Sequence, residues 1–336
     1  PAVCSERGLS ADGKVLPRWV SIALQACVSA GLIVALALIV DWDAMRTALQ
    51  SLSFSTVLIG FVIYFCSQMV MVPRWRALIS ALGVHEAPTR SWHTIFGGLF
   101  LQNFLPGSLG TDGLRVIMLS RACGSAATAM GAIIFDRAMQ LVFYGLLIAV
   151  VLVWPIPALP PRLHAAIFVC AVLGVLLVIG IFWWLGGRAA PVGTAQSGLL
   201  RKGVRLLSTM MIETGRMQLR LRRHRTALIA FWFWSLVSST LIFGIFYALL
   251  LDMGHELGLP AIILIASVSA IVTGIPISVG GVGPYEATVV VLFGLFGVPV
   301  AHAFLMALTI RVIVVAVNLT GLPSALLLWR ERRLPG

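Results

Sequence analysis

Long apolar runs are the feature of this sequence that most restricts its fold. Six of them exceed the roughly 18 residues that a membrane-spanning helix requires. They are apolar throughout and do not alternate as the strands of a membrane barrel do. With 60% hydrophobic and 11% charged residues, the chain also lacks the polar surface of a soluble globule. We therefore predict an all-α, polytopic integral membrane protein with spans at Trp19–Val40, Phe54–Val72, Ala126–Trp154, Ala165–Leu185, Thr226–Leu251 and Ala303–Trp329.

Three further apolar runs are shorter or interrupted. They are Trp92–Leu105, Pro260–Val279 and Tyr285–Val298. The first and last fall below the roughly 20 residues of a full span, so they are expected to be re-entrant halves or short tilted helices. We expect about eight membrane segments, with short or re-entrant broken helices included.

The distribution of Lys and Arg predicts the orientation of the chain. Residues 186–225 carry nine of these cations, whereas residues 252–259 carry none. By the positive-inside rule, both termini and the 186–225 loop are cytoplasmic. We predict one transmembrane domain over residues 1–336, in which this basic loop joins a first half (19–185) to a second half (226–329). The loop is either an amphipathic helix on the inner leaflet or an ordinary basic connection.

The net charge of +12 suits the anionic surface of a membrane, and no nucleic-acid partner is expected. The five cysteines form no CxxC pair, and the six histidines show no metal-ligand spacing. A P-loop and a nucleophile elbow are also absent from the sequence. We therefore expect no catalytic residue, no metal and no cofactor.

A Gly/Pro-rich segment follows the short run that ends at Leu105. Its Pro and Gly residues cannot continue a regular helix, and lipid cannot satisfy the backbone groups that they free. Such a break is tolerated only inside protein or beside a wet cavity. A simple loop with a Pro-Gly turn is the alternative. The candidate residues are Asn103, Pro106, Gly107, Gly110, and Asp112 with Arg115, whose spacing of three allows them to pair on one helical turn.

A second broken segment ends at Glu286. This acid is the only charged residue between Leu257 and Ile310, and a lone acid within the membrane suggests a functional site. The alternative is a carboxylate that merely starts a helix after a Gly-rich turn. The candidate residues are Pro276, Gly280, Gly281, Gly283 and Glu286.

The two broken segments occupy corresponding positions in the two halves. Short, Gly/Pro-interrupted stretches so placed are typical of the binding site of a transporter. The predicted orientation brings the first segment in from the cytoplasmic side and the second from outside. We therefore expect two pseudo-inverted halves.

Further ionisable residues lie within or beside the predicted spans. Asp136 and Arg137 are adjacent and point about 100° apart on a helix, so each needs a partner elsewhere. The pairs Glu286–Arg311 and Asp112–Arg137 are the candidates, and they either bind substrate or hold helices together. Arg74 and Arg76 follow the second span and are expected to be interfacial anchors that also suit a phosphate.

At these residues the sequence resembles the transmembrane region of lysylphosphatidylglycerol synthases, a flippase-like family that also occurs as stand-alone proteins. The resemblance rests on Arg74-Trp75-Arg76, Leu105-Pro106 to Arg115, Asp136-Arg137, and the Gly-rich stretch from Ile275 to Glu286. It implies a bacterial inner-membrane protein that moves a phospholipid or lipid-linked substrate between leaflets. It also implies a stand-alone form without the aminoacyltransferase domain of the full synthases.

The partners expected from this resemblance are an anionic phospholipid or a polyprenyl- or hopanoid-type lipid, a separate lipid-modifying enzyme, and a homo-oligomer. The alternative is a membrane-embedded transferase or accessory factor acting on a lipid carrier, with Asp112 or Glu286 as general base. A scaffold that anchors a partner through the 186–225 loop is a third hypothesis. In the first hypothesis, cations meet a lipid phosphate and acids meet a positive headgroup or a proton.

Overall fold

The computed structural model describes residues 31–32, 34, 38–105, 108–186, 209, 211–217, 219–221, 224–274 and 282–331. All regular secondary structure in these ranges is helical. Several expectations fall outside the described residues: most of the first predicted span (Trp19–Val40), most of the 186–225 loop, and Pro106, Gly107, Pro276, Gly280 and Gly281.

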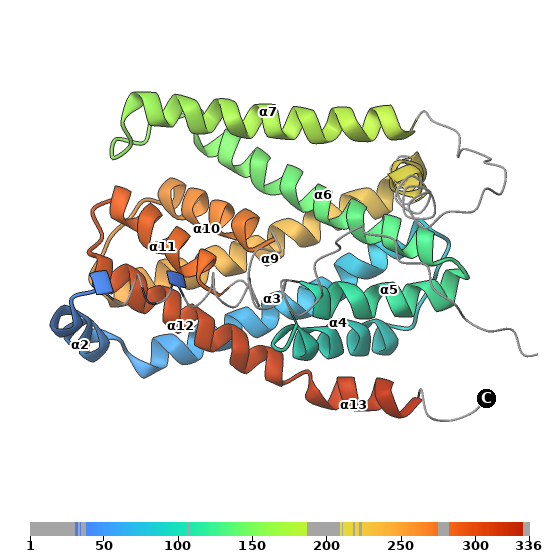
Figure 1. Cartoon of the computed structure of the whole chain (residues 1–336), viewed down its shortest axis with the longest axis horizontal. Helices are drawn as coiled ribbons and strands as arrows, with labels where there is room; N and C mark the ends of the chain where they lie inside the picture. Colours follow the sequence, from blue (N-terminus) through green and yellow to red (C-terminus); the bar gives the residue numbers. More distant parts are fainter. Residues whose placement is uncertain are drawn as a thin grey trace, which may run out of the picture.

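Five helices in the described part of the chain are long and apolar enough to cross a membrane. They run along the long axis of the molecule, and all five coincide with predicted spans (Figure 1). A short helix, α2 (Trp42–Ser51), lies at one end of this bundle and α13 (Leu322–Glu331) at the other. The long helices are α3 (Phe54–Ser80), α6 (Ala126–Val151), α7 (Pro161–Gly186), α9 (Arg225–Asp252) and α12 (Val300–Leu319). The fifth apolar stretch, Val300–Glu331, consists of α12 together with α13.

Two of these spans differ from their predicted form. The helix that was expected to end at Val72 continues through Pro73 to Ser80, because Trp75, Leu78 and Ile79 are buried in the core. The predicted span Ala303–Trp329 is divided into α12 and α13. The chain breaks beside Gly321, where an added Cβ would collide with the carbonyl group of Phe96 in helix α4 (Pro88–Gln102).

Two hairpins of short helices complete the bundle. The first pairs α4 (Pro88–Gln102) with α5 (Leu109–Cys123), and the second pairs α10 (Leu259–Gly274) with α11 (Pro284–Leu295). A helix of 15 residues is roughly 22 Å long, which is less than the roughly 30 Å of a hydrocarbon core. The first hairpin enters from the α13 end of the molecule and the second from the α2 end, so α4 and α10 extend toward the middle of the molecule from opposite sides (Figure 1).

Helix α5 was not predicted from the sequence. Residues 109–123 contain three charged side chains, which lower the hydropathy below that of a span. The helix nevertheless packs between α4 and α6, because Asp112 and Arg115 find opposite charges there. The charges of this segment are therefore buried as ion pairs, which its hydropathy alone does not reveal.

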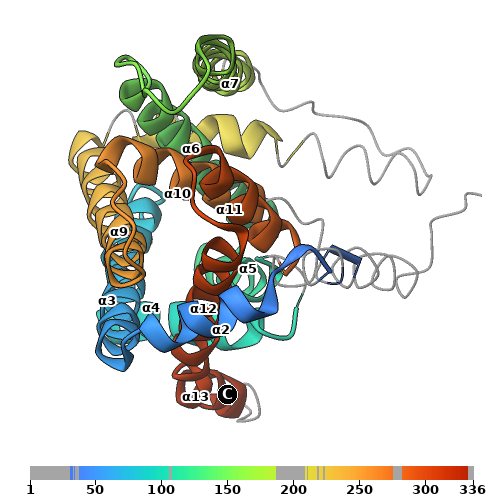
Figure 2. The same cartoon turned by 90° about the vertical axis from the view of Figure 1, so that its left-hand side faces the viewer.

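The order long, short, short, long occurs twice along the chain. It is formed first by α3, α4, α5 and α6, and then by α9, α10, α11 and α12, with the chain running in the opposite direction (Figure 1). Helices α3 and α9 pack along each other, while α7 lies outermost beside α6 (Figure 2). This arrangement matches the pseudo-inverted halves expected from the two broken segments.

The described part of the basic loop packs onto the protein. Ile212, Met217 and Leu221 are buried, and the last two belong to an apolar cluster with residues of α3, α4, α6 and α9. Met211 of the same segment, in contrast, is 45% exposed. Contacts with the rest of the protein therefore determine which face of this helical segment is buried.

Candidate functional site

A cavity of about 550 Å³ lies between the tips of the two hairpins. Eight helices contribute to its wall: both hairpins together with α3, α6, α9 and α12. One apolar cluster fills the space around α10, α11 and α12, and a second fills the space around α3, α4 and α6. Ligand sites commonly have volumes of roughly 300–1,000 Å³, so the cavity can hold a small polar group.

Asp136 is the centre of the buried charges beside this cavity. Its Oδ1 lies 2.5 Å from Nη2 of Arg74, and its Oδ2 lies 2.9 Å from Nη2 of Arg115. All three side chains are at most 5% exposed. The guanidinium of Arg74 lies over the ring of Phe231 and that of Arg115 over Trp75, 4.5 and 4.0 Å from the ring centroids. Asp136 thereby ties α6 to α3 and α5.

Asp112 continues the series of buried ion pairs in the direction of the cavity. It lies in the first turn of α5 and accepts hydrogen bonds from Nε of Arg137 at 2.9 Å and from Nη2 at 2.8 Å. Ser108 donates a further bond of 2.7 Å, and Arg115 lies 3.5 Å away. A fork of two bonds to one carboxylate fixes the guanidinium plane. Arg74, Asp136, Arg115, Asp112 and Arg137 thus form one chain of alternating charge, called here the five-residue network.

Glu286 forms a separate pair with Arg311 on α12. Its Oε1 accepts bonds of 2.8 Å from Nε and Nη2 of Arg311, and its Oε2 accepts the backbone N–H of Gly283 at 2.6 Å. Gly283 has a φ of 93°, a value that glycine adopts without the steric cost of a Cβ. Glu286 therefore closes the start of α11, as one of its two interpretations expected, and also pairs with a cation.

The two acid–arginine pairs occupy equivalent places in the repeat. Asp112 and Arg137 are 25 residues apart, and so are Glu286 and Arg311. Each acid lies in the first turn of the second helix of its hairpin, and each Arg lies on the following long helix. Both pairings were predicted from the sequence and both are confirmed.

The chain matches the family model described as the lysylphosphatidylglycerol synthase TM region over residues 20–321. It belongs to this family. The matched range contains the five-residue network, the Glu286–Arg311 pair and both hairpins. No curated protein is found to match the chain.

Of the other candidate residues of this protein, some line the cavity and others do not. Asn103 lines it and accepts a 3.1 Å hydrogen bond from Asn318. Gly110 and Gly283 lie at the starts of α5 and α11. Arg76 is exposed and is not among the lining residues. Arg74, expected to be an interfacial anchor, is 3% exposed because α3 continues past Pro73 and carries it to Asp136.

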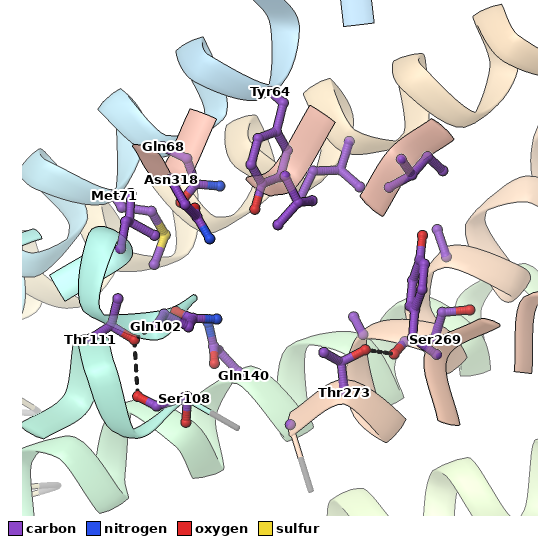
Figure 3. Close-up of a pocket in the computed structure, with 18 of the residues that line it drawn as sticks. Tyr64, Gln68, Met71, Gln102, Ser108, Thr111, Gln140, Ser269, Thr273 and Asn318 are labelled. Carbon is purple, nitrogen blue, oxygen red and sulfur yellow. Dashed lines mark hydrogen bonds between the residues drawn. The ribbon is translucent and has the colours of Figure 1, made fainter. Parts of the chain in front are cut away.

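Neutral polar side chains of the cavity were missed by the sequence analysis. Gln68, Gln102, Gln140 and Asn318 point into it from four helices (Figure 3). Gln68, Gln140 and Asn318 interrupt predicted apolar spans, and that interruption is the signal that could have identified them. An amide inside a span needs a partner or a wet cavity for the same reason as a charge.

Proposed function

We propose that this protein translocates a phospholipid or lipid-linked substrate between the leaflets of the membrane. The observation that carries the proposal is the cavity between two hairpins that enter from opposite ends, because its largely apolar wall also bears arginine and amide side chains. A headgroup cannot cross a hydrocarbon core alone, and such a cavity offers it polar contacts at mid-depth. The setting proposed is a bacterial inner membrane with both termini cytoplasmic.

The hydrogen bonds that Asp112 and Glu286 accept favour transport over a transferase reaction. A general base needs an available lone pair within reach of the proton that it removes. Asp112 and Glu286 instead each accept bonds from an Arg side chain and from a second donor. Recovery of a covalently changed lipid after incubation with the purified protein would support the transferase.

The test is Glu286→Gln in proteoliposomes that contain an acyl-labelled lipid. The substitution keeps the size of the side chain and removes the charge that holds Arg311, so we expect transfer between leaflets to slow by about tenfold. Glu256→Gln is the matched control, because Glu256 is exposed and does not line the cavity. Unchanged transfer in folded Glu286→Gln protein would refute the proposal.

A further inference from the structure

The positively and negatively charged groups beside the cavity do not face it equally. Arg115, Arg137 and Arg311 line the cavity, whereas its described lining contains no Asp or Glu. The side chains of Arg137 and Arg311 are 34% and 19% exposed, whereas those of Asp112 and Glu286, the acids with which they pair, are 15% and 2% exposed. The carboxylates therefore lie behind the guanidinium groups that they orient, and the cavity is lined by the cations.

The sum of these charges is positive. The five-residue network has three Arg and two Asp, which gives 3 − 2 = +1, and the Glu286–Arg311 pair adds zero. The network ends at Arg137, its most exposed cation. The side chain of Arg137 is 34% exposed, against 4% for Arg74 and 5% for Arg115. A net charge in a poorly solvated site is costly unless a counter-charge compensates it. A single anion in the cavity would supply that compensation.

The remaining polar groups of the wall suit the rest of a headgroup. Gln140 accepts a 3.1 Å bond from Nη1 of Arg137, which leaves the donors of its own amide for a ligand. Gln102 and Asn318 also point into the cavity (Figure 3). Amides can donate to and accept from hydroxyl groups without adding charge.

Resting on the proposed function, we infer that the cavity selects lipids whose headgroup carries a net negative charge on an oxyanion, such as a phosphate diester. Planar guanidinium forks suit such an oxyanion well. A lipid with a net positive headgroup, such as one esterified with lysine, would raise the charge of the site to +2. It would reach an acid only by breaking the 2.8 Å bonds from Arg137 or Arg311.

The experiment compares headgroups on the full chain in detergent micelles. The protein is incubated with an equimolar mixture of short-chain phosphatidylglycerol, phosphatidylcholine and lysylphosphatidylglycerol, and bound lipids are counted by native mass spectrometry. We expect phosphatidylglycerol to be retained over the lysyl lipid by about tenfold, the effect of one charge-assisted bond. Equal retention, or preference for the lysyl lipid, overturns the inference.

Two variants locate the preference, and one variant serves as the control. Arg137→Gln removes the exposed cation, and Gln140→Glu keeps it but places a carboxylate beside it. Both are expected to abolish the preference, and Gln140→Glu keeps the test decisive if Arg137→Gln does not fold. Arg121→Gln removes an exposed Arg outside the lining and should retain the preference. A preference that survives both cavity variants overturns the inference.

An inorganic phosphate arm distinguishes a lipid headgroup from a free anion. Phosphate that displaces phosphatidylglycerol at equal concentration would assign the site to the free anion and overturn the lipid assignment. Leaflet transfer of the same three lipids separates the two proposals. Selective binding without transfer refutes transport alone, whereas equal transfer of anionic and cationic lipids refutes the charge selection alone.

Discussion

At the scale of single residues, the buried carboxylate of Asp136 has the most demanding environment. Its side chain is 2% exposed and lies within 2.9 Å of two guanidinium groups from different helices. Charges removed from water are costly, and attraction compensates for this only when the geometry is good. Because the same carboxylate neutralises Arg74 and Arg115, its loss leaves two buried cations facing each other.

Asp136→Asn is therefore expected to destabilise the fold. The amide keeps the shape but removes the charge, and we expect the free energy of unfolding to fall by about 3 kcal/mol. Unfolding in detergent micelles measures the change. Asp43→Asn is the matched control: Asp43 pairs with Arg46 at 3.7 Å, but the two side chains are 92% and 81% exposed, so no measurable change is expected. Equal stability of the two variants would show that the five-residue network does not stabilise the fold.

At the scale of elements, the hairpin of α4 and α5 depends on close backbone approach. A Cβ on Gly98 would lie 2.8 Å from Cα of Thr111, and one on Gly110 would lie 2.5 Å from Cα of Gln102. Small residues allow helices to approach this closely in membranes. The contact holds Asp112 and Arg115 beside α6, so helix packing and charge placement are coupled.

Gly110→Ala tests this packing, with Gly113→Ala as its control. The first substitution forces backbone apart and should lower the free energy of unfolding by about 2 kcal/mol. At Gly113 nothing lies within 4 Å of an added Cβ, so Ala there should be neutral or stabilising by up to about 1 kcal/mol. Thermal unfolding of both variants decides the matter, and a tolerated Gly110→Ala would contradict the close approach.

At the scale of the whole molecule, the opposed hairpins divide the protein into two ends. Each end has its own apolar cluster, and the arginine-bearing cavity lies between them. Such a division suits access to one site from either side, as inverted repeats provide in transporters. The proposed orientation places the α13 end in the cytoplasm, where the basic 186–225 loop belongs by the positive-inside rule.

Single cysteines at the two ends test this orientation. Glu256→Cys and Glu331→Cys both replace exposed acids, the first between α9 and α10 and the second at the end of α13. With a membrane-impermeant maleimide on intact cells, we expect label only on Glu256→Cys, and label on both after lysis. The parent chain gives the background of its native cysteines. Labelling of Glu331→Cys in intact cells would reverse the proposed topology.

Much of the architecture follows from the sequence alone. Long apolar runs require helices in a membrane whatever their neighbours are, so the five described spans were predictable. The Gly/Pro breaks predicted two broken, short or re-entrant segments, and the isolated Glu286 and the neighbouring charges predicted the pairs with Arg311 and Arg137. These features depend on local composition, so they can be predicted from the sequence pattern alone.

The tertiary structure alone decided which charges are hidden and which line the cavity. Helix α5 escaped prediction because its charges Asp112 and Arg115 are neutralised by Arg137 and Asp136 of the next helix, α6, a pairing that hydropathy does not report. Arg74 was expected at the interface, yet the continuation of α3 past Pro73 brings it to Asp136. The direction of a side chain depends on the neighbours of its helix, and those are set only when the helices pack. For this reason the sequence determined a membrane protein with paired charges, and packing decided that its cavity is lined by arginines.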